Sequence, residues 1–274
     1  MKQISGNIYY TELVNHLDIN SEDCILIASD ITKLALQARK NNQKFTVDEF
    51  IASFQQKLVK GTILIPAFTD NIKDGGTFDY KKDKPTTGAL SNKIRRNKSF
   101  NRTQDPIHSF YVWGKFQDEL INLSVENTFG VNSVFDFLHQ KKGKMIFIDV
   151  DLQNSFTFVH HVEKCLNVPY RKDYLLNINY IDSRGDKKPA VAVFHTKKRG
   201  VFTHLAPLQN AFITNGVLSQ LNYGGICVRQ LEFDRAFDEV KNWLESGNKL
   251  HGFSLKLFFK QWIKLIMGYK KPID

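Results

Sequence analysis

The sequence predicts an α/β fold in which a central mixed sheet, parallel at least in part, is flanked by helices. Short apolar runs typical of buried strands recur along the chain, and helical patterns stand between them. Such alternation is typical of strand–helix–strand units, which bring strands together in parallel. The 274 residues are 42% hydrophobic and 24% charged, so the chain has an ordinary globular composition and can bury a substantial core.

In the first half of the chain, apolar runs predict strands, and amphipathic or capped segments predict helices. The expected elements are a strand at 24–28, a helix at 33–40, a helix from the capping box Thr46-Val-Asp-Glu49 to about 59, a strand at 61–66, a polar glycine-rich loop at 69–84 and a helix from Pro85 to Arg96.

The second half continues the alternation and adds a pair of strands around a turn. The expected elements are a strand at 108–113, a helix capped by Ser133, a strand at 145–150, a helix opening near Thr157, strands at 173–182 and 189–195, a strand at 225–229 and a helix at 232–244 closed by Gly247.

We expect a single α/β domain over residues 1–246, followed by a basic amphipathic helix or tail over residues 247–274. In this tail, apolar residues recur at helical spacing and three lysines line another face. Such a helix docks on its own domain or on a dimer partner, or it lies on a membrane surface, and the sequence leaves these alternatives open. The apolar residues are Leu255, Phe258, Phe259, Trp262 and Ile266, and the lysines are Lys256, Lys260 and Lys264.

The formal net charge of +10 indicates an anionic partner such as a nucleotide, coenzyme A or a phospholipid surface. It argues against a polycationic substrate, because like charges slow encounter. Nucleic acid is not an expected partner, since the chain has no zinc-finger spacing, no RNA-recognition signature and no dense basic helix.

The three cysteines are too few and too far apart for a disulfide framework or a cysteine zinc site. Cys24 and Cys227 lie in apolar strand-like runs and are expected to be inert. The first residues have no apolar signal-peptide core, and no apolar run is long enough to span a membrane. We therefore expect a cytoplasmic bacterial protein, with a peripheral place at the inner membrane as an extension of the tail hypothesis.

The segment Thr157-Phe-Val-His160-His-Val-Glu163 carries the clearest chemical pattern. On a helix, Thr157, His160 and Glu163 are successive i, i+3 neighbours on one face. A carboxylate that orients a histidine, with a hydroxyl beside it, can take a proton from an incoming nucleophile. A zinc site formed by His160, His161 and Glu163 is not expected, because adjacent helix residues diverge and no third ligand is indicated.

Several segments in order resemble the aminoglycoside 3-N-acetyltransferase-like family over roughly residues 24–171. They are Ser29-Asp30-Ile31-Thr32, Pro85-Thr-Thr-Gly-Ala-Leu, Arg102-Thr-Gln-Asp-Pro-Ile-His108-Ser-Phe, Asn127-Thr-Phe-Gly-Val-Asn-Ser-Val-Phe-Asp136, Gly143-Lys-Met-Ile-Phe-Ile, the Thr157–Glu163 segment and Val168-Pro-Tyr-Arg171. The resemblance implies that family's α/β fold and an acyl-CoA-dependent transferase that acylates an amine on a sugar.

The resemblance also implies roles for individual residues. His160 is the expected general base, Glu163 its orienting carboxylate and Thr157 a donor to the developing oxyanion, with no metal. The expected acyl-CoA contacts are Ser29, Asp30, Ile31, Thr32, Arg102, His108 and Ser109, and the expected substrate contacts are Asp79, Tyr80 and Thr86.

This chain departs from the family pattern in two places. Asp105 stands where the family often has His or Asn, and Ala28-Ser29-Asp30-Ile31 replaces the usual His-Ser-Ser-Leu. Because a carboxylate is unfavourable beside phosphate, Asp30 is expected to cap the following helix instead. A basic cluster of Lys93, Arg95, Arg96 and Arg102 is an alternative source of phosphate contacts, or simply a solvated face.

The resemblance and the positive charge together predict N-acylation of a dTDP- or UDP-linked amino-deoxy sugar for surface polysaccharide synthesis. The donor is expected to be acetyl-CoA or 3-hydroxybutyryl-CoA, and the active unit to be a monomer or a homodimer. Two alternatives stay open: aminoglycoside 3-N-acetylation, which would give antibiotic resistance, and a non-catalytic scaffold role in glycan assembly.

Overall fold

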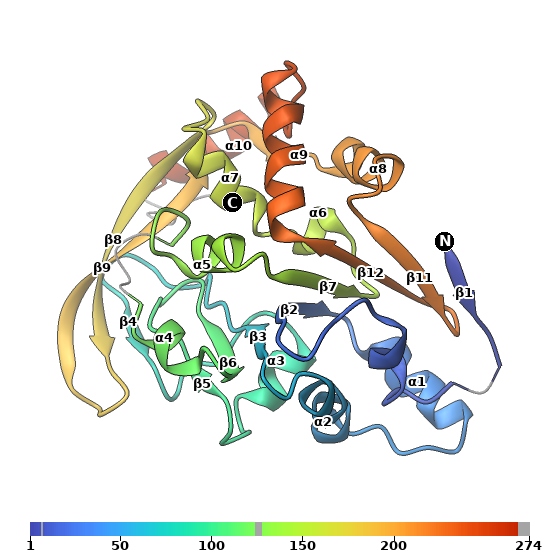
Figure 1. Ribbon diagram of the computed structural model, residues 1–274. Helices are drawn as coiled ribbons and strands as arrows, with labels where there is room; N and C mark the ends of the chain where they lie inside the picture. Colours follow the sequence, from blue (N-terminus) through green and yellow to red (C-terminus); the bar gives the residue numbers. More distant parts are fainter. Residues whose placement is uncertain (7, 124–127, 268–274) are drawn as a thin grey trace.

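The computed structural model describes residues 1–6, 8–123 and 128–267 of the chain. Its centre is an eight-stranded mixed sheet with the strand order β1-β11-β12-β7-β2-β3-β6-β5 (Figure 1). The strands are β1 (Lys2–Ile4), β2 (Cys24–Ser29), β3 (Thr62–Pro66), β5 (Asn101–Arg102), β6 (Phe110–Gly114), β7 (Lys144–Ile148), β11 (Ser219–Tyr223) and β12 (Ile226–Glu232).

Helices cover both faces of this sheet. In Figure 1, α1, α2 and α3 lie below it, and α5, α7 and α9 lie above it. The helices are η1 (Leu13–His16), α1 (Thr32–Lys40), α2 (Val47–Lys57), α3 (Ala89–Ile94), α4 (Gln117–Ile121), α5 (Val134–Gln140), α6 (Leu152–Ser155), α7 (Val159–Cys165), α8 (Ala206–Thr214), α9 (Phe233–Glu245) and α10 (Leu255–Ile266).

The hydrophobic core is divided by the sheet into two clusters, and strand alternation decides which residues enter each. In β2, Ile25 and Ile27 join the cluster under α1 and α2, while Leu26 and Ala28 join the cluster under α5 and α9. Because successive strand residues point to opposite faces, a strand buried on both sides reads as a continuous apolar run. The continuous apolar run at residues 24–28 therefore reflects the burial of β2 on both faces.

Three neighbouring strands of the sheet run in parallel and end at the same edge. β2 pairs in parallel with both β3 and β7, and β7 is joined to β12 in an antiparallel pairing. The carboxyl ends of these strands lead to Ser29, Pro66 and Val150. Open α/β sheets collect their ligands at such an edge, so the fold directs attention to these three positions.

A second, three-stranded sheet stands beside the central one and supplies a third small core. It contains β4 (Thr77–Asp79), β8 (Arg171–Ile181) and β9 (Lys187–Lys197), with β8 and β9 forming a long antiparallel hairpin. Phe78, Ile178 and Phe194 are among its buried residues. The long loop expected at 69–84 therefore contains one short strand, which extends this sheet through its parallel pairing with β8.

The segment after residue 246 begins as part of the domain. Leu250 is fully buried, and β13 (His251–Phe253) pairs antiparallel with β10 (Val201–Thr203). The expected helix follows as α10, whereas residues 268–274 of the expected tail lie outside the described residues. Across the described parts of the chain, no helix has both the length and the hydrophobicity to cross a bilayer.

The predicted fold class is confirmed, and most predicted elements are found within a few residues of their expected bounds. The predicted N-caps at Thr46 and Ser133 are present, since Thr46 Oγ1 accepts from the Glu49 N–H and Ser133 Oγ accepts from the Asp136 N–H. The main local difference follows β7. The short helix α6 precedes α7, and Thr157 lies before the start of α7 rather than on it.

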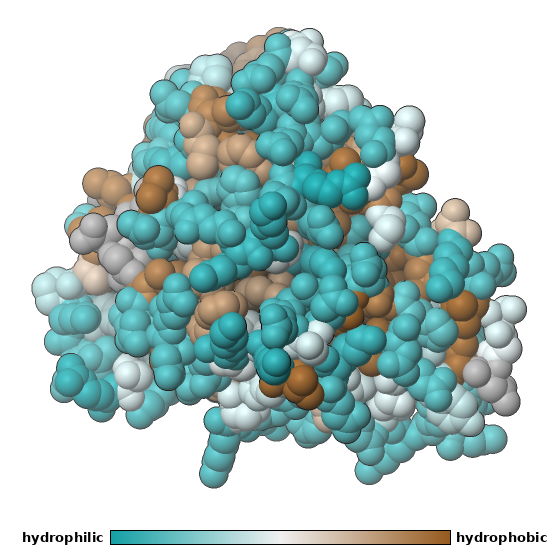
Figure 2. Space-filling view, viewed as in Figure 1, coloured by the Kyte–Doolittle hydropathy of each residue, from teal (hydrophilic) through white to brown (hydrophobic). Residues whose placement is uncertain are grey.

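The outer face shown in Figure 2 is mainly hydrophilic, with hydrophobic residues gathered in smaller separate patches.

The close pairing of β3 with β6 ends at Gly114, which lies opposite Thr62. A Cβ atom at Gly114 would lie 2.2 Å from the Gly61 carbonyl oxygen, and its φ of +105° favours glycine. Gly185 has a similar φ of +99° but open space around it.

We predict that Gly114→Ala lowers the free energy of unfolding by roughly 2–4 kcal/mol, because it combines backbone strain with a backbone clash. Gly185→Ala, the matched control, adds only the backbone strain and should cost about 1 kcal/mol. Urea unfolding of the two variants measures the difference. Equal losses would mean that the contact between the two strands is not the constraint.

Candidate active site

The predicted pair of His160 and Glu163 is formed on α7. The His160 Nδ1 atom lies 2.7 Å from Glu163 Oε2, as expected for i, i+3 neighbours on a helix. His160 is partly exposed, whereas the Glu163 side chain is only 1% exposed. Because a carboxylate accepts hydrogen bonds, Nδ1 carries the proton in this pair, and Nε2 is the basic nitrogen.

Two residues that the sequence analysis left without a role complete the environment of Glu163. Tyr170 donates its hydroxyl proton to Glu163 Oε1 at 2.8 Å, and Arg171 Nε forms an ion pair with Oε2 at 2.5 Å. Burial alone would raise the pKa of the Glu163 carboxyl. The hydrogen bond from His160, the charges of His160 and Arg171 and the bond from Tyr170 together lower that pKa to about 2.

Arg171 connects three parts of the site through its planar guanidinium group. Besides its ion pair with Glu163, Nη1 donates to the His195 carbonyl oxygen at 3.1 Å. Nη2 lies 3.4 Å from His160 Nε2, so the basic nitrogen of His160 faces a donor in this structure. The only sequence signal for Tyr170 and Arg171 was their place in the matched Val168-Pro-Tyr-Arg171 segment.

An aromatic wall stands beside His160, and its centre is Phe129. The Phe129 ring centroid lies 4.8 Å from that of His108, 5.5 Å from that of His160 and 6.1 Å from that of His195. His195 Nδ1 is 2.7 Å from Asp173 Oδ1, yet burial lowers the pKa of the His195 imidazole. The first residue of the matched segment that contains Phe129, Asn127, lies outside the described residues.

Thr157 lies where two cavities meet. One cavity, of about 370 Å³, opens at the carboxyl ends of β2, β3 and β7 and is lined by Ser29, Pro66, Thr86 and Thr157 among others. A second cavity, of about 220 Å³, is lined by Thr157 and His160. Asn154, Ser155 and Thr157 contribute to both walls. Ser29, Thr86 and Thr157 therefore line the first cavity, and Thr157 and His160 line the second.

The loop from Ser29 to Thr32 separates the first cavity from a basic groove. Ser29 Oγ is buried and has no hydrogen-bond partner among the described residues, which leaves it for a ligand in the cavity. Asp30 Oδ1 accepts from the Thr32 N–H at 2.9 Å, but the N-cap of α1 is Ile31, which makes no side-chain cap bond, so Asp30 lies one residue before its expected cap position. Bonds from Thr32 and the nearby charge of Lys33 hold the pKa of the Asp30 carboxyl below its usual value.

The basic groove itself has a volume of about 890 Å³. Ile31 and Thr32 line it, and four basic residues surround it together with a single carboxylate, that of Asp48. The basic residues are Arg39, Lys44, Lys93 and Arg96. Of the predicted basic cluster, Lys93 and Arg96 therefore face this groove.

Arg102 and Ser109 have a different place from the one expected. Arg102 is buried, and its guanidinium donates to the carbonyl oxygens of Tyr80, Asp83 and Ala67 and to the hydroxyls of Thr69 and Ser109. These bonds use all five N–H groups of the side chain. Ser109 Oγ donates in turn to the Ala67 carbonyl oxygen. Both residues anchor the loop between β3 and α3, and their direct contact with CoA stays a prediction that this arrangement does not support.

The three predicted substrate contacts are not grouped together. Thr86 lines the first cavity, where its hydroxyl lies 2.9 Å from Asp70 Oδ1. Tyr80 donates to the Arg102 carbonyl oxygen and lines a separate cavity with Tyr180. The Asp79 carboxylate accepts backbone N–H bonds within its own loop. Substrate contact by Tyr80 and Asp79 therefore stays a prediction without support from their position.

We predict that Glu163 contributes stability that is lost in acid. Because its pKa is about 2 in the folded protein and near 4.5 when exposed, the contribution is complete above pH 4.5 and disappears as the pH falls towards 2. The shift corresponds to roughly 3 kcal/mol. Urea unfolding between pH 6 and pH 2.5 should show a smaller acid loss for Glu163→Gln than for the wild type. Parallel pH profiles for the two proteins would contradict this assignment.

A family model described as aminoglycoside 3-N-acetyltransferase matches residues 36–245 of the chain. In a comparison with curated proteins, no sequence matches.

Several solved structures have a fold similar to that of this protein. AAC-IIIb in its binary form with CoASH has a TM-score of 0.73 and 16% identity, over 87% of this chain and 96% of that chain. YokD from Bacillus subtilis has a TM-score of 0.69 and 16% identity, over 86% and 96%. Sisomicin-bound AAC-VIa has a TM-score of 0.71 and 14% identity, over 88% and 97%. At these identities the likeness establishes the fold, whereas the family model spans most of the sequence. This protein therefore belongs to the aminoglycoside 3-N-acetyltransferase family of CoA-dependent acyltransferases.

Proposed function

We propose that this protein transfers an acetyl group from acetyl-CoA to an amine of an aminoglycoside or a closely similar amino sugar. The pairing of His160 with the buried Glu163, in the wall of a cavity beside the carboxyl ends of three parallel strands, carries the proposal. Family membership indicates the reaction class. The hydrogen bond from His160 Nδ1 to Glu163 leaves His160 Nε2 as the proposed base.

In the proposed reaction, the acceptor amine attacks the thioester carbonyl carbon. Its proton passes to His160 Nε2, while the imidazolium is stabilised by Glu163 through the bond at Nδ1. The Thr157 hydroxyl is proposed to donate to the oxyanion of the tetrahedral intermediate. When this intermediate collapses, the C–S bond breaks, the amide remains on the sugar, and the CoA thiolate takes up a proton.

Acyl-CoA is proposed to lie along the Ser29–Thr32 loop. Its phosphates would be held in the basic groove by Arg39, Lys44, Lys93 and Arg96, since anions are stabilised by converging cationic side chains. Its pantetheine arm would enter the first cavity and satisfy the buried Ser29 hydroxyl. This arrangement directs the thioester towards Thr157, where the two cavities meet.

The first cavity has a local charge that differs from the net charge of the chain. Asp70 is the one acidic residue in its wall, which contains no basic residue, whereas Lys197 lines the second cavity beside His160. The net charge of +10 therefore does not by itself exclude a polycationic acceptor, because the four clustered basic residues line the separate groove. A structural neighbour that holds sisomicin supports the aminoglycoside class of acceptor.

A second candidate acceptor is an amino-deoxy sugar linked to dTDP or UDP, which would assign the enzyme to surface polysaccharide synthesis. The positive net charge favours it, because a nucleotide sugar is an anion. In this case 3-hydroxybutyryl-CoA is an alternative donor. Both candidates would use the same base and the same thioester site. Assays with aminoglycosides and with nucleotide-linked amino sugars therefore distinguish them.

We predict acetyl-CoA-dependent release of CoA thiol with gentamicin, kanamycin or sisomicin, measured by thiol titration. His160→Asn should lower kcat by a factor of about 10³ or more while leaving acetyl-CoA binding within about twofold, because the base acts in the chemical step. Glu163→Gln should lower kcat less, since it alters the orientation and charge of the base rather than removing it.

The controls separate the acceptor classes. dTDP- and UDP-linked amino sugars are assayed in parallel with acetyl-CoA and 3-hydroxybutyryl-CoA, and His16→Asn serves as the matched variant on the distant helix η1. Thiol release with nucleotide sugars alone would select the second candidate. Normal turnover by His160→Asn would exclude His160 as the base. If no acceptor caused release of CoA thiol, the result would favour the non-catalytic scaffold role.

We also propose that α10 binds an anionic membrane surface, which would hold this cytoplasmic enzyme at the inner membrane. Gln261 is the one buried residue of this helix, and its Oε1 accepts from the Gly200 N–H at 2.7 Å. The apolar residues instead face outward, with Leu255 and Ile266 each 65% exposed and Trp262 44% exposed. Such an outward apolar face is typical of a helix that lies in a membrane interface.

The charges of α10 favour a membrane over a second copy of the chain. Lys256, Lys260 and Lys264 follow at i, i+4 spacing beside the apolar face, and the helix contains no acidic residue. Anionic headgroups attract such a stripe, whereas a second copy would bring a further stripe of the same sign. A homodimer through this face is therefore the less favoured occupant.

We predict that the full chain floats with vesicles that contain phosphatidylglycerol and much less with neutral phosphatidylcholine vesicles. The double variant Phe259→Ser, Trp262→Ser should lose this binding, whereas Val59→Ser, a still more exposed apolar site on the domain, should keep it. A wild-type chain that ignores both vesicle types and elutes as a dimer would assign the face to a second copy.

A further inference from the structure

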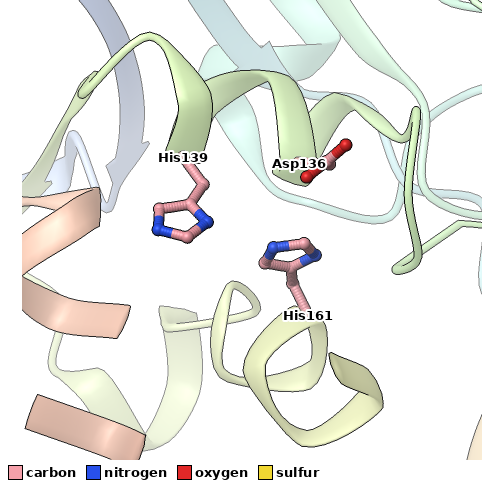
Figure 3. Close-up of side chains that lie close together, drawn as sticks. All are labelled: Asp136, His139 and His161. Carbon is pink, nitrogen blue, oxygen red and sulfur yellow. The ribbon is translucent and has the colours of Figure 1, made fainter. Parts of the chain in front are cut away.

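A second cluster of ionisable side chains lies behind the active site and takes no part in the proposed reaction. Asp136 and His139 come from α5, and His161 comes from α7. One ligand atom from each of the three lies within 4.8 Å of the others. Figure 3 shows the three side chains directed towards one another across the space between the two helices.

His161 is prepared to act as a neutral ligand through one defined nitrogen. Its Nδ1 lies 2.7 Å from the Phe129 carbonyl oxygen, and a carbonyl can only accept, so Nδ1 carries the proton. The lone pair is therefore on Nε2. The residue is 1% exposed, and burial lowers the pKa of its imidazole. A ring whose second nitrogen donates to a backbone carbonyl is the usual arrangement of a metal-bound histidine.

The two ligands from α5 are also held in place. Asp136 Oδ2 accepts from the Asn132 N–H at 2.8 Å and from Gln140 Nε2 at 2.9 Å, which fixes the carboxylate and leaves Oδ1 for an ion. The His139 ring stacks on Phe237 with centroids 4.2 Å apart and planes inclined by 14°. As i, i+3 neighbours, Asp136 and His139 project from one face of their helix.

Cys165 lies beside the three-residue cluster, at the i, i+4 spacing from His161 that would let it join as a fourth donor. It follows His161 by four residues on α7, and its Sγ lies 3.8 Å from His161 Nε2. The cysteine is exposed and free, so rotation about its Cα–Cβ bond can turn the sulfur towards the cluster. Burial raises the pKa of this thiol, and a bound cation would reverse that effect by stabilising the thiolate.

We propose that Asp136, His139, His161 and Cys165 bind one zinc-like divalent cation between α5 and α7. Two imidazoles, a carboxylate and a thiolate are a donor set that suits zinc and not magnesium or calcium, which prefer oxygen ligands. Tetrahedral zinc sets its nitrogen and oxygen ligand atoms about 3.4 Å apart, so the three atoms, now within 4.8 Å of one another, would each move closer to their neighbours by up to about 1.4 Å around the ion.

The cation would act as a brace and not as a reactant. α7 carries both His160, which lines the second cavity, and His161, which faces α5. A bond from His161 to α5 would fix the orientation of α7 and hence of the catalytic histidine beside it. The expected effect is a gain in stability, because a ligand that binds only the folded chain stabilises it.

The test is equilibrium dialysis of the untagged full-length protein, stripped with EDTA, against zinc chloride, with metal content measured by mass spectrometry. We expect about one zinc per chain and a rise in Tm of roughly 5 °C at saturating zinc. His139→Gln and Asp136→Asn should each weaken binding at least about tenfold. Cobalt(II) in place of zinc should give a thiolate-to-metal charge-transfer band that Cys165→Ser abolishes.

Two controls keep the result independent of the proposed function. His16→Gln removes a histidine far from the cluster, and His160→Asn removes the proposed base, so both should retain full zinc uptake. Less than about half a zinc per chain in the wild type would overturn the proposal. So would unchanged uptake in both His139→Gln and Cys165→Ser, because the bound metal would then lie elsewhere.

Discussion

The buried carboxylate of Glu163 is the interaction on which the active site depends. It accepts hydrogen bonds from His160 on its own helix and from Tyr170 just before β8, and it forms an ion pair with Arg171 at the start of β8. One side chain therefore fixes the tautomer of the proposed base and the position of α7 against the second sheet. A buried carboxylate is stable only with such partners, and the loss of Glu163 would leave the Arg171 charge buried without compensation.

The distribution of charge over the surface limits what the net charge says about the acceptor. A sum of +10 says nothing about where the charges lie. Here four basic residues surround the groove beside the Ser29–Thr32 loop, and the neighbouring cavity contains the single carboxylate of Asp70. The groove and the first cavity therefore present different local charges to a ligand.

The two adjacent histidines of α7 show how one short helix can serve two purposes. Successive helix residues point about 100° apart, so His160 faces the second cavity while His161 faces α5. The same divergence that argued against a joint zinc site of His160 and His161 permits a separate site on the other side of the helix. Only the position of α5 reveals it, because Asp136 and His139 are far from His161 in the sequence.

The sequence by itself determined the fold class, most strands and helices, both capped helices and the pairing of His160 with Glu163. These features depend on local periodicity, capping and i, i+3 spacing, which a few neighbouring residues specify. The tertiary structure alone decided the partners of Glu163, the role of Arg102 and the separation of Asp79 and Tyr80 from the cavity. A basic residue in a matched motif suggested a phosphate contact, yet Arg102 is enclosed by carbonyl and hydroxyl oxygens that come from the segment after β3 and from Ser109 just before β6. Such contacts join residues far apart in the chain, and only the packing of the whole domain brings them together.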